Sequence, residues 1–171
     1  LGDVYKRQIH IYGTNAKVNM RNDAKLKDIP GELISIKARN ESRTIKTFSK
    51  DKAGGIRNTA FQAVLNLKIG AEVILVHNLD TLDGLTNGAR GVLVAVEKKD
   101  GAVKRLLVKF HNPDHGRSRR EKETCWKHPD ATYLDPVLWN YFLGGATASV
   151  LQFALKGAAA ITSHKIQVGG K

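Results

Sequence analysis

The residues best suited to chemistry lie near the C-terminal end of the sequence, in the run ITSHKIQ. The hydroxyls of Thr162 and Ser163 and the ring of His164 can each hydrogen-bond a phosphate oxygen, and Lys165 adds a full positive charge. Gln167 can both donate and accept. This combination indicates contact with the backbone of a nucleic acid. A helix start capped by Thr or Ser, followed by ordinary surface polar residues, is the alternative interpretation.

A second group of basic residues surrounds one expected β-hairpin. Lys104 and Arg105 begin its second strand, and Lys98, Lys99 and Lys109 lie close to them in the sequence. A sheet surface with a basic edge can follow the phosphates of a single strand, so we predict that Lys104 and Arg105 contact nucleic acid. A hairpin whose charges are simply solvated explains the same pattern equally well.

Metal and nucleotide chemistry have weaker support. His111 and His115 are four residues apart, and Cys125 and His128 are three apart, which are spacings that zinc could use. Their charged surroundings and the single cysteine disfavour zinc, and we expect no metal. The sequence has no G-x-x-x-x-G-K-[ST] loop to wrap nucleotide phosphates. The Gly-rich run GLTNGARG lies between two β-type runs, which favours a tight structural loop.

The composition favours a polyanionic partner. The 171-residue chain has 28 Lys and Arg against 16 Asp and Glu, a formal charge of +12. This balance favours nucleic acid over an acidic protein surface or a membrane. No apolar run approaches the roughly 20 residues that a membrane span needs. The single cysteine excludes an internal disulfide and fits a reducing compartment.

The first part of the chain, residues 9–67, contains a mixture of strand-like, helix-like and irregular patterns. Residues 9–12 are typical of a strand, which turns into a helix capped by Thr14 and Asn15. The run ELISIKA follows as a strand with alternating faces. Residues 39–57 are polar and basic without a period, which predicts a linker or a surface excursion. Residues 61–67 space their apolar side chains as one or two turns of helix.

The middle of the chain is β-rich. The runs AEVILVHNL, GARGVLVAVEKKDG and KRLLVKFHN predict three strands, with a tight turn at Asp100 and Gly101, and such short strands usually close into a small barrel. Residues 113–127 are typical of an exposed charged loop, and the proline within 133–143 predicts partial order. The run LQFALKGAAA begins as a buried strand that carries ITSHKIQ to its carboxyl end, where open α/β sheets bind ligands.

Three stretches resemble motifs of one helicase family. LQFALKGAAAITSHKIQ is similar to the fifth helicase motif of the petite-integration-frequency (PIF) and related Helitron helicases, a pattern close to Q-F-P-L-K-x-A-x-A-I-T-x-H-K-x-Q-G. LKIGAEVILVHNLDTLDGLTNGARGVLVAV resembles their L-K-x-G-A-x-V-M-L-x-x-N-x-x-x-x-G-L-x-N-G-x-R-G-x-V segment, and IYGTNAKVNMRNDAKLKDIPGE resembles an earlier T-N-containing segment. The stretches stand in the family's order. The fifth motif departs from the pattern at Ala154, Gly157, Ala159 and Val168.

The resemblance implies an α/β fold, a partial second RecA-like domain with an inserted SH3-like small β-barrel. Residues 9–40 would start the RecA-like domain, residues 67–148 would form the insert with its charged loop, and residues 149–171 would return to the RecA-like domain. Residues 41–66 are then a linker or helical excursion. Residues 1–8 are expected to be a non-native tail.

The resemblance also assigns roles to single residues. Thr162, His164 and Lys165 would hold the backbone of single-stranded DNA, and Lys165 and Gln167 would couple it to the nucleotide cleft. A further set matches structural loops of the family and is expected to shape the fold first and contact DNA second: Thr14, Asn15, Asn87, Gly88, Arg90 and Gly91.

The implied function is that of a fragment of an ATP-dependent DNA helicase, which unwinds duplex DNA while translocating on single-stranded DNA. Its cofactors would be ATP and Mg²⁺, and its partners single-stranded DNA and the missing first RecA-like domain, with no membrane. The fragment alone is expected to be inactive and to bind neither cofactor, because both RecA-like faces must meet around the phosphates. A non-enzymatic nucleic-acid-binding SH3-like module is the alternative. The form of ITSHKIQ favours a nuclear location, with a bacterial or viral cytoplasm as the alternative.

Overall fold

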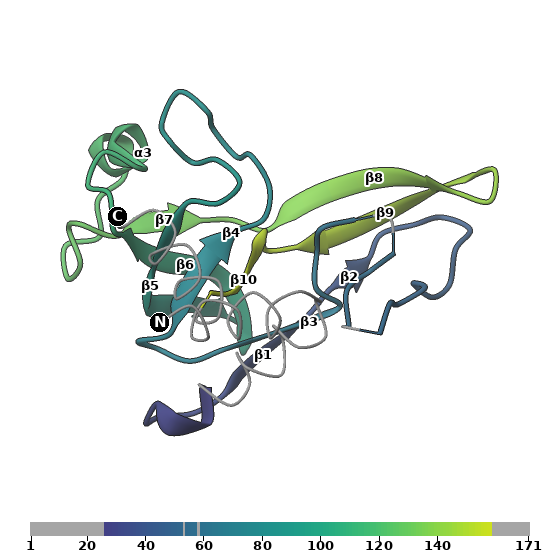
Figure 1. The fold of residues 1–171 in the computed structure, drawn as a ribbon, viewed down its shortest axis with the longest axis horizontal. Coiled ribbons are helices and arrows are strands. Elements are labelled where there is room, and N and C mark those ends of the chain that lie inside the picture. Colours follow the sequence, from purple (N-terminus) through teal and green to yellow (C-terminus); the bar gives the residue numbers. More distant parts are fainter. Residues whose placement is uncertain (1–25, 53, 58, 159–171) are drawn as a thin grey trace, which may run out of the picture.

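The computed structural model describes residues 26–52, 54–57 and 59–158. Within them, every strand pairing is antiparallel (Figure 1). None of the described helices is long and apolar enough to cross a membrane. The elements are β1 (Ile34–Lys37), β2 (Arg39–Asn40), β3 (Val64–Leu67), β4 (Glu72–Leu75), β5 (Arg90–Lys99), β6 (Ala102–Phe110), α3 (Arg117–Lys122), β7 (Thr132–Leu134), β8 (Val137–Leu143), β9 (Ala146–Gln152) and β10 (Leu155–Gly157).

A five-stranded sheet in the order β10-β4-β5-β6-β7 contains the middle of the chain. The three strands predicted there are confirmed, and β5 and β6 form the longest hairpin of the sheet. The tight turn is confirmed too, because Asp100 and Gly101 both adopt positive φ, 54° and 81°. One face of this sheet packs on the first cluster of buried side chains, which includes Leu67, Leu75, Leu93, Leu106 and Val108.

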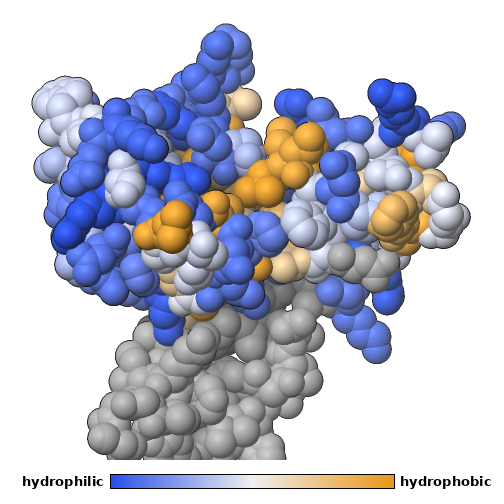
Figure 2. All heavy atoms as spheres, turned by 90° about the horizontal axis from the view of Figure 1, so that it is seen from above, coloured by the Kyte–Doolittle hydropathy of each residue, from blue (hydrophilic) through white to orange (hydrophobic). Residues whose placement is uncertain are grey.

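A three-stranded sheet in the order β2-β9-β8 extends away from the first sheet (Figure 1). Its inner face packs on a second buried cluster, which includes Ile56, Phe61, Tyr141, Ala148 and Val150. Figure 2 shows hydrophilic residues over most of the lobe formed by the five-stranded sheet and α3, with hydrophobic residues reaching the surface between that lobe and the β8–β9 hairpin. The described residues therefore form two buried clusters, one under the five-stranded sheet and one under the three-stranded sheet, and β1 and β3 pair as a separate two-stranded sheet.

Residues 61–67 do not form the helix that the sequence predicted. Instead β3 pairs with β1, with Ile36 opposite Leu65 and Ile34 opposite Leu67. Leu65 and Leu67 are buried whereas Val64 is 38% exposed, which is the two-residue alternation of a strand. The run is short, so its apolar spacing fits a helical turn and a strand almost equally well, and the pairing with β1 decides between them.

Of the two alternatives predicted over 39–57, a linker or a surface excursion, the structure agrees with the excursion, because this segment folds onto the second sheet. It contains β2, a bridge between Lys50 and Ile56, and a side chain, Ile56, that is only 1% exposed. A few apolar residues separated by polar ones leave no period in the sequence, so the pattern could not reveal this packing. The residues between β2 and β3 form a structured excursion.

Two further segments are more ordered than the sequence indicated. The charged run 113–127 contains α3 and not only an exposed loop. The run 133–143 forms most of β7 and all of β8, although only partial order was predicted. Pro136 lies between the two strands, where its missing N–H removes no hydrogen bond from either ladder.

Candidate nucleic-acid interface

The cluster on which the functional prediction depends lies outside the described residues. This applies to Thr162, Ser163, His164, Lys165 and Gln167, and also to the expected cap residues Thr14 and Asn15. The structure does show the strand that leads to the cluster. The roles assigned to these residues therefore stay predictions. The structure describes only the part of the chain that precedes the cluster.

The approach to the cluster runs through β10, which is the edge strand of the five-stranded sheet. After β9 ends, the chain crosses between the two sheets through Phe153 and Ala154, both buried, and β10 then pairs with β4. The N–H of Ala158 donates to the carbonyl of Glu72 at 3.2 Å. The buried strand predicted from LQFALKG is confirmed only in part, because Leu151 and Gln152 end β9 and a separate short strand, β10, begins at Leu155. Ala158, the last described residue, follows β10 and is three positions before Ile161, so the sheet fixes the point from which the chain continues toward the cluster.

Arg90, at the start of β5, reaches this point from the neighbouring loop. Its Nη2 donates to the carbonyl oxygen of Ala158 at 2.9 Å. Burial lowers the pKa of the Arg90 guanidinium, and the Glu72 carboxylate acts in the opposite direction. Among the described residues, the buried Nε of Arg90 finds no hydrogen-bond partner. The planar guanidinium therefore positions the backbone at Ala158, which lies 68 residues further along the sequence.

The other matched loop residues shape the turn that carries Arg90. The N–H of Asn87 donates to the side-chain oxygen of Asn78 at 2.7 Å, and the N–H of Gly88 donates to the carbonyl of Leu75 at 2.8 Å. Gly88 adopts a φ of 102°, which favours glycine. At Gly91, a Cβ would lie 2.5 Å from a backbone oxygen of β6, so only glycine fits there. These contacts are structural, and DNA contact at this loop stays a prediction.

The two hairpin residues predicted to contact nucleic acid differ in their surroundings. The Arg105 guanidinium lies 2.7 Å from the Glu123 carboxylate, 2.9 Å from that of Glu97, and 3.8 Å over the ring centroid of Tyr133. Hydrogen bonds to Glu123 and then Glu97 raise the pKa of Arg105. Its side chain is only 16% exposed, so its charge is largely neutralised within the fold. Lys104 is exposed and available to a partner.

Sequence reasoning missed a buried carboxylate that joins the Gly-rich loop to α3. Asp83 is 6% exposed, and its carboxylate accepts the backbone N–H groups of Ser118 and Arg119 at 2.8 and 3.1 Å. These are N–H groups of the first helical turn, which have no partner within a helix. Asp83 is separated from them by 35 residues in the sequence, so no local pattern could have identified it as the cap.

The histidine and cysteine pairs have local explanations. His111 Nε2 lies 2.8 Å from the Glu72 carboxylate, whereas His115 packs against the ring of Phe110. The backbone carbonyl of Cys125 accepts the N–H of His128 at 3.1 Å in a turn. Within the part of the chain that the structure describes, no group of three or more potential metal ligands comes together. Cys125 and His128 therefore lie in one turn, whereas His111 and His115 make contacts with different residues.

Comparison with known proteins gives a consistent family. Residues 57–96 match the model described as the 2B domain of the DNA helicase Pif1. The chain is 34% identical over 152 residues to the ATP-dependent DNA helicase PIF1 of Xenopus laevis and 31% identical over 151 residues to that of Danio rerio. Each alignment covers 88% of this chain and 20% of the relative, so the chain spans about a fifth of their length.

Solved structures agree on the fold. The crystal structure of Pif1 helicase from Candida albicans aligns over 86% of this chain and 33% of its own, with a TM-score of 0.60 and 24% identity. A Bacteroides Pif1 helicase in complex with ADP-AlF3 and single-stranded DNA aligns over 85% of this chain and 28% of its own, with a TM-score of 0.53 and 18% identity. At these identities the likeness concerns the fold.

Proposed function

We propose that this chain, which belongs to the Pif1 family of DNA helicases, is a segment of an ATP-dependent DNA helicase that contributes contacts to the backbone of single-stranded DNA. The observation that carries the proposal is the course of β10. This strand leaves the sheet at Ala158, held by Arg90 and Glu72, directly before the phosphate-binding residue types of ITSHKIQ. Resemblance to PIF1 helicases over 88% of the chain supports the same function.

The finer architecture is part of the proposal. We assign the five-stranded sheet to the SH3-like insert of the family, and the ends of the chain to the second RecA-like domain. The match of residues 57–96 to a Pif1 2B domain supports the first assignment. In this arrangement β10 belongs to both units, because it pairs with β4 of the insert and continues into the fifth motif. A displacement of the insert would then be transmitted to the DNA-binding residues through one strand.

ATP and Mg²⁺ would act where the two RecA-like domains meet, and they would supply the energy for stepping along the strand. Lys165 and Gln167 are the residues of this chain that we propose to couple DNA to nucleotide. No phosphate loop occurs in the 171 residues, so we assign no step of hydrolysis to them. The described residues act on the DNA side, where β10 leads the chain toward the segment that contains Thr162 and His164.

Fluorescence anisotropy with a labelled single-stranded oligonucleotide, at two salt concentrations, tests the proposal. The variant His164→Ala/Lys165→Ala should lose binding, because it removes one positive charge and one phosphate-bonding ring. Lys127→Ala/His128→Ala is the matched control, since it removes the same side-chain types from the turn after α3. Equal binding by the two variants would contradict a DNA contact at ITSHKIQ.

A non-enzymatic nucleic-acid-binding module is the second candidate function. The observation in its favour is the exposure of Lys98, Lys99 and Lys104 around one hairpin turn, where they could contact phosphates without any motor. ATP hydrolysis stimulated by single-stranded DNA, measured on the full parent protein, separates the two. Stimulated hydrolysis that is lost in His164→Ala/Lys165→Ala supports the helicase, and its absence from the full parent protein supports the module.

A further inference from the structure

Residues 37–57, which run from the end of β1 through β2 into the excursion that precedes β3, are strongly basic. Residues 37–57 contain seven Lys and Arg against two acidic residues, Glu41 and Asp51, a surplus of five positive charges out of the chain's twelve. The charge cannot be explained by a solvated linker, because the segment packs on the second buried cluster through Ile45 and Phe48. A structured basic surface is a candidate for binding a polyanion.

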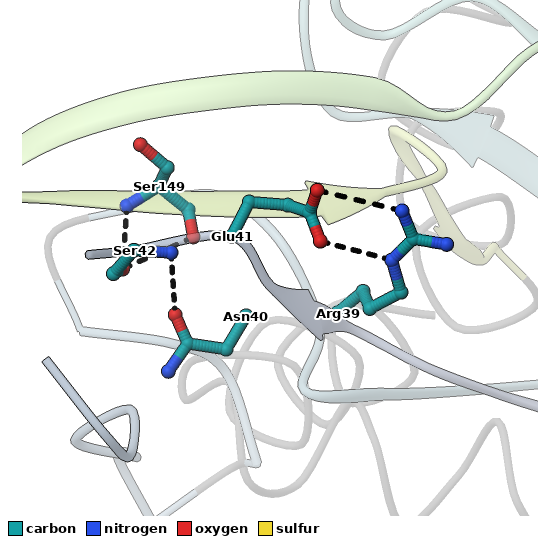
Figure 3. A network of polar contacts seen from close by, with 5 residues as sticks. All are labelled: Arg39, Asn40, Glu41, Ser42 and Ser149. Atoms are coloured by element: carbon teal, nitrogen blue, oxygen red, sulfur yellow. Dashed lines mark hydrogen bonds and ion pairs between the residues drawn. The ribbon is translucent and has the colours of Figure 1, made fainter.

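A network of hydrogen bonds holds this segment against β9 (Figure 3). The side-chain amide of Asn40 donates to the carbonyl of Ile45 at 2.7 Å and accepts the N–H of Ser42 at 2.9 Å. The N–H of Ser149, in β9, donates to the Ser42 hydroxyl at 2.8 Å. Further along, Lys50 pairs with Ile56 across an antiparallel bridge. The backbone that carries the basic side chains is thus fixed at both ends.

A pocket of about 340 Å³ opens between this segment and the end of β1. Three lysines from different parts of the backbone line it, Lys37, Lys46 and Lys50, together with the half-buried ring of Phe48. Its remaining lining is small or neutral and consists of Ala38, Asn40, Thr47, Ala63 and Val64. The pocket therefore combines an aromatic surface with concentrated positive charge and has no acidic residue in its wall.

The three lysine charges are not neutralised by the described part of the chain. None of them forms an ion pair with a described carboxylate. Of the two acidic residues in this segment, Glu41 is paired with Arg39 at 3.0 Å (Figure 3). Asp51, which follows Lys50 in the sequence, accepts the backbone N–H of Gly55 at 2.8 Å. Hydrogen bonding to Arg39 lowers the pKa of Glu41. An incoming anion would therefore meet three ammonium groups that form no ion pair with a described carboxylate.

We infer that this pocket binds one nucleotide unit of single-stranded nucleic acid, with the base against Phe48 and the flanking phosphates on Lys37, Lys46 and Lys50. A nucleotide matches the pocket in two ways. Its base has a flat π-face that can stack on the Phe48 ring, and its phosphates carry negative charge that the lysines can bind. The inference rests on the proposed function for the type of ligand. It places a contact beside β2 and β3, on segments that contain neither ITSHKIQ nor the Lys104 hairpin.

The salt dependence of oligonucleotide binding tests the phosphate contacts. The variant Lys37→Gln/Lys46→Gln/Lys50→Gln should reduce the slope of log K against log salt by about 2, since each phosphate contact on a single strand contributes about 0.7. Arg117→Gln/Lys122→Gln/Lys127→Gln removes the same charge from the α3 side and should change the slope less. Equal slopes in the two variants would overturn the inference.

The ring contact is tested separately. Phe48→Leu keeps an apolar side chain on the second cluster but removes the ring, and it should weaken binding roughly fivefold or more, the loss of one base–aromatic stack. With an oligonucleotide that has abasic sites, the variant and the original chain should bind equally. A loss that persists on the abasic strand would overturn the inference.

The test distinguishes this inference from the proposed function. If the original chain binds DNA and only His164→Ala/Lys165→Ala weakens it, the pocket is wrong and the proposed function stands. If only the pocket variants weaken binding, the pocket is supported and the contact at ITSHKIQ is wrong. An original chain that binds no single-stranded DNA would contradict both.

Discussion

Replacing Arg90 by Met tests how the fold presents ITSHKIQ to DNA. The change removes the 2.9 Å hydrogen bond from the guanidinium to the carbonyl of Ala158. A hydrogen bond that involves a charged group contributes about 1.5–3 kcal/mol to stability. Against this, the low-dielectric site disfavours the charge, as the lowered pKa of Arg90 indicates, and the Nε atom already lacks a partner. The expected net loss is therefore about 1–2 kcal/mol.

Thermal unfolding and DNA binding measure the two consequences. A loss of about 1–2 kcal/mol corresponds to a fall in Tm of about 2–8 °C for a domain of this size. Arg39→Met is the control, since Arg39 is 69% exposed and its pair with Glu41 lies on the surface, where such pairs contribute less than about 1 kcal/mol. We expect Arg90→Met also to weaken oligonucleotide binding more than Arg39→Met does. If the two variants match in both Tm and affinity, the positioning role of Arg90 is refuted.

Two further predictions concern the five-stranded sheet. Leu106→Ala, at a fully buried position of β6, should lower the free energy of unfolding by about 2–5 kcal/mol in urea titrations. The control is Phe142→Ala, at a position 81% exposed on β8. An equal loss in the two variants would contradict the assigned core. Hydrogen bonding to Arg105 lowers the pKa of Glu123 from 4.5, so this carboxylate stabilises the fold above that pH and loses its effect as pH falls through the lowered pKa. The stability difference between the original chain and Glu123→Gln should therefore shrink on acidification in pH-resolved unfolding curves, and a constant difference would contradict the ion pair.

Much of the central sheet could be predicted because its information is local. The strands β4, β5 and β6 are rich in Val, Leu and Ile, and the turn at Asp100 and Gly101 requires residues that tolerate positive φ. The strand β3 was missed for the opposite reason. Four residues contain too little periodicity to separate strand from helix, and the decision comes from pairing with β1, about 30 residues earlier.

The residue types of the candidate site could be predicted from the sequence, but the contacts that hold the surrounding backbone in place could not. ITSHKIQ stands out by composition, and the resemblance to PIF helicases assigns it a role. The contact from Arg90 to Ala158 and the cap that Asp83 provides for α3 join residues 68 and 35 positions apart. No pattern within a short window specifies such pairs. The sequence predicts only a linker or surface excursion for the segment that lines the lysine pocket, because the packing of this segment depends on a few isolated apolar side chains.

Photocrosslinking is the most direct test of the claim that this chain holds single-stranded DNA at ITSHKIQ. An oligonucleotide with photoreactive bases would be irradiated with the full 171-residue chain, and the attached peptides identified by mass spectrometry. The account predicts crosslinks within residues 161–167, reduced in His164→Ala/Lys165→Ala. Crosslinks that occur only elsewhere, for example within residues 98–104 of the β5–β6 hairpin, would contradict it.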